Sequence, residues 1–181
     1  MTADDLMAVL AERLKVEGLS LNEQRIAGIS VGDMQIGFEE DDEGVWLHVY
    51  ADVVKDAAAL SKECLLSLLR SHNLFNDVPN ASFGVSRTGA LTLFMRVHLL
   101  DSLTADVWMA MFLSFLVSLR DWRAKLAQEG GEPVIADAEP GSAKDFRQFS
   151  VPESYSNHGK TVKFPDFQSL LAKRFVVKGD G

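Results

Sequence analysis

The sequence predicts an α+β protein with the element order α-β-β-β-α-β-β-α and a mostly antiparallel sheet. Three segments place apolar residues at helical spacing, and five shorter segments have the composition and alternation of strands. Most neighbouring strands are separated by short polar connections that contain glycine, as in β-hairpins, whose strands run antiparallel. Helices combined with such a sheet define the α+β class.

The first helix is expected over residues 4–16. Leu6, Leu10 and Leu14 recur there at helical spacing, so they share one apolar face. Asp4 stands at the start, where a negative charge suits the positive end of the helix dipole.

Three strands follow, over residues 25–31, 34–38 and 45–50, and the first has the weakest signal. Ile36 and Phe38 share one face of the second strand. The third strand alternates two sets of side chains, with Val45, Leu47 and Val49 on one face and Trp46, His48 and Tyr50 on the other. The acidic stretch EEDDEG between the second and third strands is typical of a hairpin tip.

The second helix is expected over residues 56–72, with Asp56 as its N-cap. Its apolar stripe consists of Leu60, Cys64, Leu65, Leu68 and Leu69, and Leu66 widens it. A second hairpin follows, with strands at 81–86 and 91–97 and a turn at Thr88–Gly89.

The third helix is expected over residues 104–127. Its stretch VWMAMFLSFLV, residues 107–117, has ten apolar residues among eleven. One side of such a helix must cover the sheet, and its other sides must meet the second helix, a partner subunit or a bound ligand. An exposed apolar patch of that size would be unusual on a monomer.

The chain divides into a body, residues 1–129, and a C-terminal extension, residues 130–181. The first part of the extension, 130–160, is rich in Gly, Pro, Ser and charged residues, which is typical of a linker. An apolar island follows, with five large apolar residues between Phe164 and Phe175, and predicts a short docking segment.

The net charge of −8 excludes some classes of partner. Residues 130–181 hold seven basic and seven acidic residues, so the whole acidic excess lies in residues 1–129. That balance argues against nucleic acid and against insertion into an anionic membrane. The sequence shows neither a signal peptide nor the roughly 20 apolar residues that a membrane span needs. With a single cysteine, Cys64, no internal disulfide can form, so we expect a cytoplasmic protein.

The sequence offers no catalytic constellation. Cys64 lies within a helical stripe, as a buried structural thiol does, and the histidines at 48, 72, 98 and 158 lack metal-ligand spacing. The stretch HGKT at 158–161 lacks the first glycine of a phosphate-binding loop. We therefore expect no enzyme, no cofactor and no metal, and a protein that works by binding others.

The order of these features resembles a known family. The stretches LLSLLRSHNLF, SFGVSRTGALTLFMRVHLLDSLTADVW and FLVSLRDWRAKLA are similar to those of class I type III secretion chaperones of the Tir-chaperone (CesT-like) type. The resemblance covers roughly residues 3–128 and is most specific over 65–126. None of its motifs is catalytic.

The resemblance implies a cytoplasmic homodimer that acts in virulence without hydrolysing ATP. Such chaperones bind an extended N-terminal segment of a secreted effector and keep it soluble and competent for secretion, and the secretion ATPase is a further partner. By position, the dimer candidates are Leu65, Leu68 and Leu69. The cargo-binding candidates are Leu6, Leu10, Leu14, Ile36, Phe38 and Trp46.

Several alternatives remain open at this point. Each candidate residue could belong to the ordinary core instead. The extension could support the dimer, cover the cargo site or contact the secretion machinery. The same fold could also serve as a protein-binding module unrelated to secretion, and an enzyme is the most remote alternative.

Overall fold

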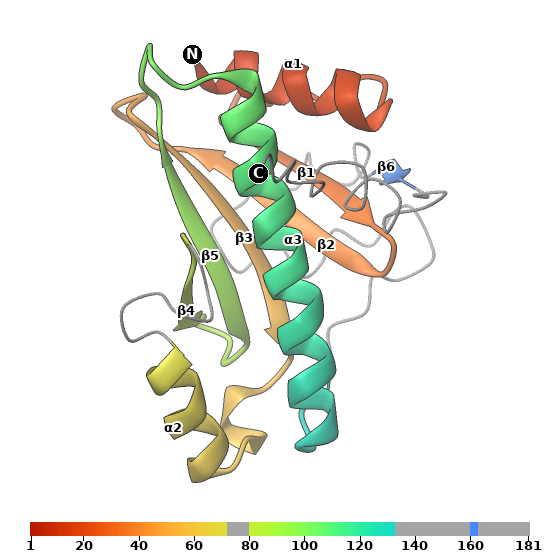
Figure 1. The fold of residues 1–181 in the computed structure, drawn as a ribbon, viewed down its shortest axis with the longest axis vertical. Coiled ribbons are helices and arrows are strands. Elements are labelled where there is room, and N and C mark those ends of the chain that lie inside the picture. The colour runs from red at the N-terminus through yellow and green to blue at the C-terminus, as the bar shows by residue number, and fades with distance from the viewer. Residues whose placement is uncertain (72–79, 133–159, 163–181) are drawn as a thin grey trace, which may run out of the picture.

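The computed structural model describes residues 1–71, 80–132 and 160–162 (Figure 1). The elements in chain order are α1 (Ala3–Leu14), β1 (Ile26–Val31), β2 (Met34–Glu40), β3 (Trp46–Val54), the 3₁₀ turn η1 (Ala57–Ala59), α2 (Lys62–Ser71), β4 (Ser82–Val85), β5 (Leu91–His98), α3 (Ala105–Gln128) and β6 (Lys160–Val162). From α1 to α3 this order confirms the predicted α-β-β-β-α-β-β-α arrangement.

The strands form one sheet in the order β4-β5-β3-β2-β1-β6. Every neighbouring pair from β4 to β1 is antiparallel, as predicted, whereas β6 lies parallel to β1. β6 begins at Lys160, the last residue of the segment predicted to be a linker, so the sequence prediction missed this strand. Three residues are too few to show a recognisable period.

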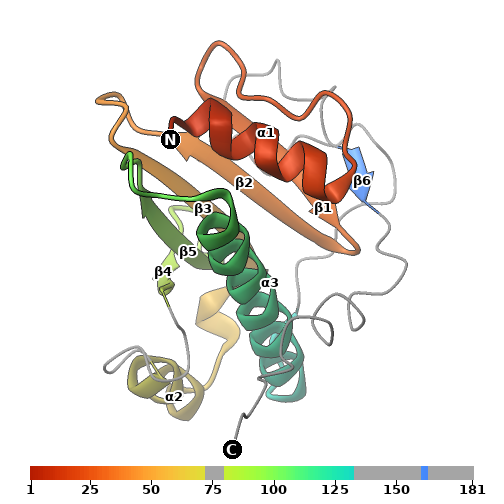
Figure 2. The same ribbon diagram turned by 45° about the horizontal axis from the view of Figure 1, so that its top comes forward.

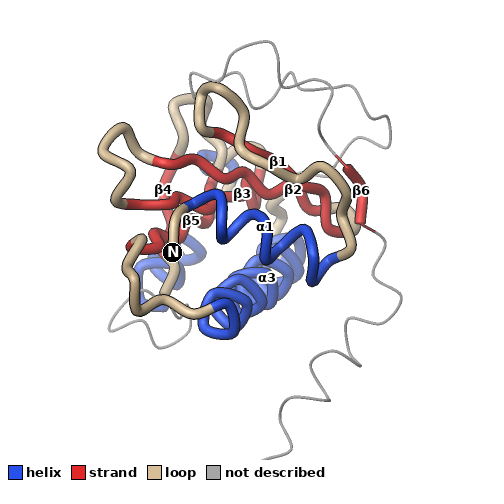
Figure 3. Tube along the Cα trace, turned by 90° about the horizontal axis from the view of Figure 1, so that it is seen from above, coloured by secondary structure: helices blue, strands red, loops and turns tan. Residues whose placement is uncertain are grey.

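α1 and α3 cover the same face of the sheet (Figure 3). The indole Nε1 of Trp108 in α3 donates a hydrogen bond to the carbonyl of Leu6 in α1, at 2.9 Å, and so fastens the two helices together. The ring of Phe112 packs 5.8 Å from that of Phe38 on β2. The core therefore lies between these two helices and the inner face of the sheet.

The burial of α3 explains much of its unusual composition. Its fully or nearly fully buried large apolar residues are Trp108, Met109, Phe112, Phe115, Leu116, Leu119, Trp122 and Leu126. Val107, by contrast, is half exposed at the start of the helix. The sheet and α1 thus account for most, but not all, of the apolar surface of this helix.

α1 begins and ends at well-defined caps. Thr2 accepts a hydrogen bond from the backbone N–H of Asp5, and the Asp5 side chain accepts one from the N–H of Thr2. The helix ends at Leu14, two residues earlier than predicted, because Lys15 adopts a left-handed conformation.

The second helix is shorter than predicted. Asp56 does act as an N-cap, but of the turn η1, where its carboxylate accepts from the N–H of Ala58. Leu60 is then extended, and α2 begins at Lys62, where the hydroxyl of Ser61 accepts from the N–H of Cys64. The expected last residue of this helix, His72, lies outside the described residues.

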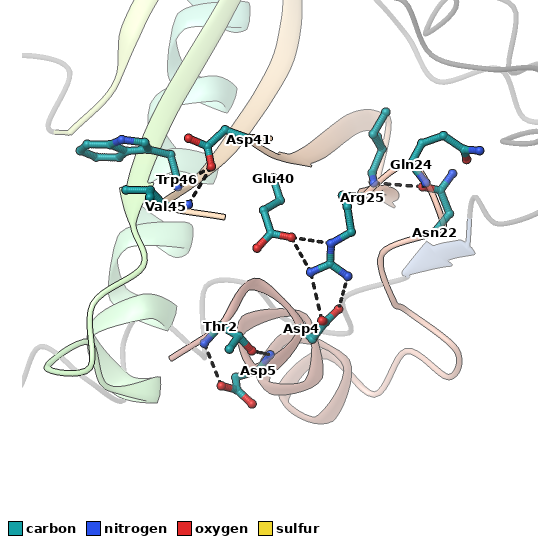
Figure 4. Close-up of polar contacts among 11 residues, drawn as sticks. Thr2, Asp4, Asp5, Asn22, Gln24, Arg25, Glu40, Asp41, Val45 and Trp46 are labelled. Atoms are coloured by element: carbon teal, nitrogen blue, oxygen red, sulfur yellow. Dashed lines mark hydrogen bonds and ion pairs between the residues drawn. The ribbon is translucent and has the colours of Figure 1, made fainter. Parts of the chain in front are cut away.

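Arg25 joins α1 to the sheet (Figure 4). Its guanidinium donates to both carboxylate oxygens of Asp4, at 3.0 and 3.1 Å, and also pairs with Glu40 at the end of β2. The hydrogen bond to Asp4, followed by that to Glu40, raises the pKa of Arg25 against the opposing effect of burial. Residues from three separate elements of the sequence are thereby held together at one corner of the body.

The chain beyond α3 packs back onto β3. The N–H of Gly131 donates to the carbonyl of Leu126 at 2.8 Å. Glu132 accepts from the backbone N–H of Lys55 at 3.1 Å, and its carboxylate pairs with the ammonium of Lys55 at 2.7 Å. Ordered contacts therefore extend to Glu132, slightly beyond the boundary at 129 that the sequence suggested, and the division into two parts stays a prediction.

Candidate protein-binding surfaces

α2 presents a row of exposed leucines. Cys64 and Leu68 point inward and are buried, whereas Leu65, Leu66 and Leu69 lie on the outer side of the helix. Leu69 is 70% exposed, an unusual state for a large apolar side chain. Of the three dimer candidates, Leu65 and Leu69 are therefore at the surface, and Leu68, 4% exposed, belongs to the core of the subunit.

β4 forms the sheet edge at the same end of the molecule (Figure 2). Within the described part of the chain, β4 has a neighbouring strand on one side alone, β5. Val85, its last residue, is 63% exposed. A short strand with an open edge and an apolar residue at its end is a surface on which another chain can pair.

Five of the six cargo candidates lie in the core. Leu6, Leu10, Ile36 and Phe38 have no exposed surface and Leu14 has little, because the apolar face of α1 packs against the sheet and α3. These five residues shape the body from within and offer no surface to a partner while α1 rests on the sheet. Periodicity identified the apolar face correctly but could not tell what covers it.

The sixth candidate, Trp46, lies on the opposite face of the sheet. Its ring stacks on the imidazole of His98 with centroids 4.4 Å apart, and the guanidinium of Arg96 lies 4.4 Å from the same ring. Both neighbours are exposed residues of β5, the strand that pairs with β3. The six candidates therefore do not form one surface, and Trp46 alone among them remains accessible to a partner.

The face that carries Trp46 also holds the half-buried His48. Burial, followed by the charge of Arg96, lowers the pKa of His48, against a smaller opposing effect of Asp41. The register places Arg96 and Glu39 on either side of His48 across the sheet. This outer face is thus a mixed aromatic and charged surface, distinct from the apolar face of α2.

Two observations on the described residues bear on metal binding and on nucleophilic chemistry. No group of three His, Cys, Asp or Glu side chains in this part of the chain could hold a metal ion. Burial raises the pKa of Cys64 to about 11, so the thiolate that a nucleophile requires is scarce at neutral pH. None of the described helices is both long and apolar enough to cross a membrane.

Comparison with known proteins identifies the fold. No family model and no curated protein matches the sequence. Among solved structures, a chain of the ExsC–ExsE complex matches with a TM-score of 0.57 and 22% identity, covering 68% of this chain and 96% of that one. A chain of the HopA1–SchA chaperone–effector complex matches with a TM-score of 0.55 and 14% identity, over 66% and 91% of the two chains.

A third match is a chain from the crystal structure of the Yersinia pestis type III secretion chaperone SycH in complex with a stable fragment of YscM2. Its TM-score is 0.53 at 17% identity, over 68% of this chain and 98% of that chain. The chain thus has the fold of the type III secretion chaperones, and the match spans nearly their whole length. The narrower Tir-chaperone branch stays a prediction from the sequence.

Proposed function

We propose that this protein is a class I type III secretion chaperone. In this account it binds an extended N-terminal segment of a secreted effector in the cytoplasm and keeps that effector soluble and secretion-competent without hydrolysing ATP. The observation that carries the proposal is the fold, which matches chains from complexes between secretion chaperones and their protein partners.

The character of the surface supports a binding role. The exposed large apolar residues of the described chain are Leu65, Leu66, Leu69, Val85, Leu100 and Val107, and they come from helices, a strand edge and a loop. Such residues gain free energy when a partner removes them from water, at about 25 cal/mol per Å² of apolar surface.

We further propose a homodimer that forms through α2 and the edge of β4. A two-fold interface lets the same leucine row pack against its own copy, so that one patch covers another. Leu65, Leu66 and Leu69 supply the apolar centre, and Val85 extends it along β4. Among the three dimer candidates, Leu68 contributes indirectly, by holding α2 on the body.

Trp46 is the proposed cargo contact. Its ring packs against Arg96 and His98, so it loses little conformational freedom when a partner side chain contacts it. The other five cargo candidates contribute by keeping the sheet in shape beneath α1. The secretion ATPase is a further proposed partner, in the step that follows cargo loading.

Co-purification from the native host tests this function. The tagged full chain is isolated, and the proteins bound to it are identified by mass spectrometry. We expect an exported protein that binds through its N-terminal segment, that is less soluble when expressed alone, and whose secretion falls when the gene for this chain is deleted. A bound protein that is not exported, and whose solubility does not depend on this chain, would favour a binding module unrelated to secretion.

A further inference from the structure

The edge of β1 is occupied by a segment of the same chain. Lys160, Thr161 and Val162 pair in parallel with Ile29, Ser30 and Val31. The segment reaches this edge from α3, which ends at Gln128 on another part of the body, so its arrival there does not follow from chain connectivity alone. Figures 1 and 2 both show β6 beside β1, at the border of the sheet.

The hydrogen bonds of β1 define how much of this edge is open. The N–H of Glu40 donates to the carbonyl of Arg25, so the backbone groups of Arg25 face β2. Because these groups alternate along a strand, those of Ile26, Gly28 and Ser30 point away from β2. Asn22 already caps Ile26, through its own N–H and through its side-chain oxygen.

What remains is a short slot at Gly28 and Ser30 that can accept one extended peptide. Ser30 is the register partner of Thr161, so the central residue of β6 lies opposite Ser30 in this slot. A backbone slot of this kind selects an extended segment and makes few demands on its side chains. Thr161 and Val162 are β-branched, a type that favours extended backbone.

We propose that the β1 edge is a strand-addition site, that residues 160–162 occupy it at rest, and that an extended segment of a partner protein enters it by displacing them. The last part rests on the proposed function, because it takes the partner to be the effector. The claim that residues 160–162 occupy the β1 edge at rest does not depend on that function.

Tethering sets the strength of this competition. Residues 133–159 connect the described end of the body to β6. For a connection of that length the effective concentration is of order 1 mM. A tethered strand that binds the slot with an intrinsic dissociation constant of about 100 µM would therefore weaken the binding of a free peptide roughly tenfold, compared with a chain whose slot is vacant.

Proline substitutions at two adjacent positions of the full chain distinguish the loss of strand pairing from the other effects of a proline. In a parallel ladder the open groups of Ser30 are expected to pair with the carbonyl of Lys160 and the N–H of Val162, while the N–H of Thr161 points away. Val162→Pro removes the donor that the ladder uses, whereas Thr161→Pro is the matched control.

Amide exchange reports occupancy of the slot. In the wild type and in Thr161→Pro, the N–H of Ser30 is expected to be protected. In Val162→Pro it should exchange at least about tenfold faster, while Ile29 and Val31, whose amides face β2, keep their protection and show that the body is folded. Free exchange of Ser30 in the wild type would overturn the proposal, and so would equal protection in Val162→Pro.

A labelled peptide of residues 156–166 reports access to the slot. We expect it to bind Val162→Pro about tenfold more tightly than the wild type, and Thr161→Pro to behave as the wild type does. Equal affinity for all three chains would contradict occupation by the tethered strand. This measurement needs no effector, so it stands even if the proposed function fails.

The identified effector tests the displacement step. When it binds the wild-type chain, the amide of Val162 should lose protection while that of Ser30 keeps it, because one strand replaces another. An effector that binds while Val162 stays protected would overturn displacement and leave the chaperone function in place.

Discussion

Gly37 and Tyr50 show how a single residue can determine the outer face of the sheet. The two residues are register partners on β2 and β3. A Cβ built on Gly37 would lie 2.8 Å from the hydroxyl oxygen of Tyr50 and closer still to its ring carbons. The aromatic ring can therefore lie against the sheet because position 37 has no side chain.

Gly37→Ala is expected to destabilise the protein by about 1–3 kcal/mol, because the buried Tyr50 ring must leave its place. Gly28→Ala is the matched control. Gly28 pairs with Gly37 across β1 and β2, but a Cβ there would lie 3.7 Å from the nearest atom, in ordinary contact. Urea unfolding of both variants measures the difference, and equal stability would show that Tyr50 does not depend on Gly37.

His48 gives the outer face a pH dependence of known sign. Its pKa is lowered in the folded protein, so the unfolded chain, with an ordinary pKa of about 6.5, binds a proton more readily. Stability contributed by neutral His48 is present above pH 6.5 and is lost as the pH falls toward the lowered pKa.

Between pH 7.5 and 5.5 the wild type should therefore lose more unfolding free energy than His48→Gln, measured by urea titration at each pH. Glu39, whose pKa is raised by burial and then by Asp42, has the opposite effect as the pH falls, and because both proteins contain it, the difference between them reports the histidine. An identical decline in the two proteins would contradict the assignment.

At the scale of single residues, the sequence correctly predicted the face of the sheet on which a side chain lies, but it could not show whether that side chain is accessible to a partner. Alternation correctly placed Leu47 and Val49 on one face of β3 and Trp46 and His48 on the other. It could not show that α1 and α3 meet over Ile36 and Phe38, because that contact joins segments far apart in the chain. The candidates assigned to a cargo groove for their apolar character were therefore mostly core residues.

At the scale of elements, α2 combines two functions on opposite sides of one helix. Its inner side, with Cys64 and Leu68, fastens it to the body, and its outer side exposes Leu69. Leu68 and Leu69 are neighbours in sequence but differ in burial. Substitutions at these two positions therefore distinguish an effect on folding from an effect on the proposed assembly.

Leu69→Asp is expected to yield a monomer whose thermal stability, at a concentration where both proteins are monomeric, matches the wild type. Leu68→Asp should instead lower the unfolding free energy by several kcal/mol, because it places an unpaired charge in the core. Size-exclusion chromatography with light scattering and thermal unfolding report the two effects. A Leu69→Asp protein that remains dimeric would move the interface elsewhere.

Long elements, whose apolar pattern repeats over several turns, were predictable from the sequence, whereas the two elements of three residues were not. The 24 residues of α3 carry their pattern through several turns, and the sequence placed its ends within one residue. η1 and β6 hold three residues each and depend on capping or on pairing with a distant strand. The predicted docking segment, 164–175, lies outside the described residues and stays a prediction.

At the scale of the whole molecule, the body has one core, between the sheet and the helices α1 and α3, and two outer surfaces of different character. α2 and β4 offer an apolar surface suited to a second copy, while the β1 edge lies away from it (Figure 1). Trp46 is the first residue of β3, at the end of that strand remote from α2. A dimer formed through α2 would therefore leave the proposed cargo surfaces free on both subunits.

This arrangement predicts the mass of the free protein. Light scattering at micromolar concentration should give about twice the chain mass of 19.9 kDa. A monomer under these conditions would contradict the proposed interface, and it would leave the leucines of α2 without an explanation.

The central claim is that an extended segment of another protein binds along this fold, and limited proteolysis of the native complex tests it most directly. The complex is isolated from the host, digested, and the protected part of the partner is sequenced. The account predicts that a segment from the partner's N-terminal region survives, bound to the chain, although the same segment is degraded when free. Protection of a folded domain remote from the partner's N-terminus, with its N-terminal region digested as fast as in the free protein, would contradict it.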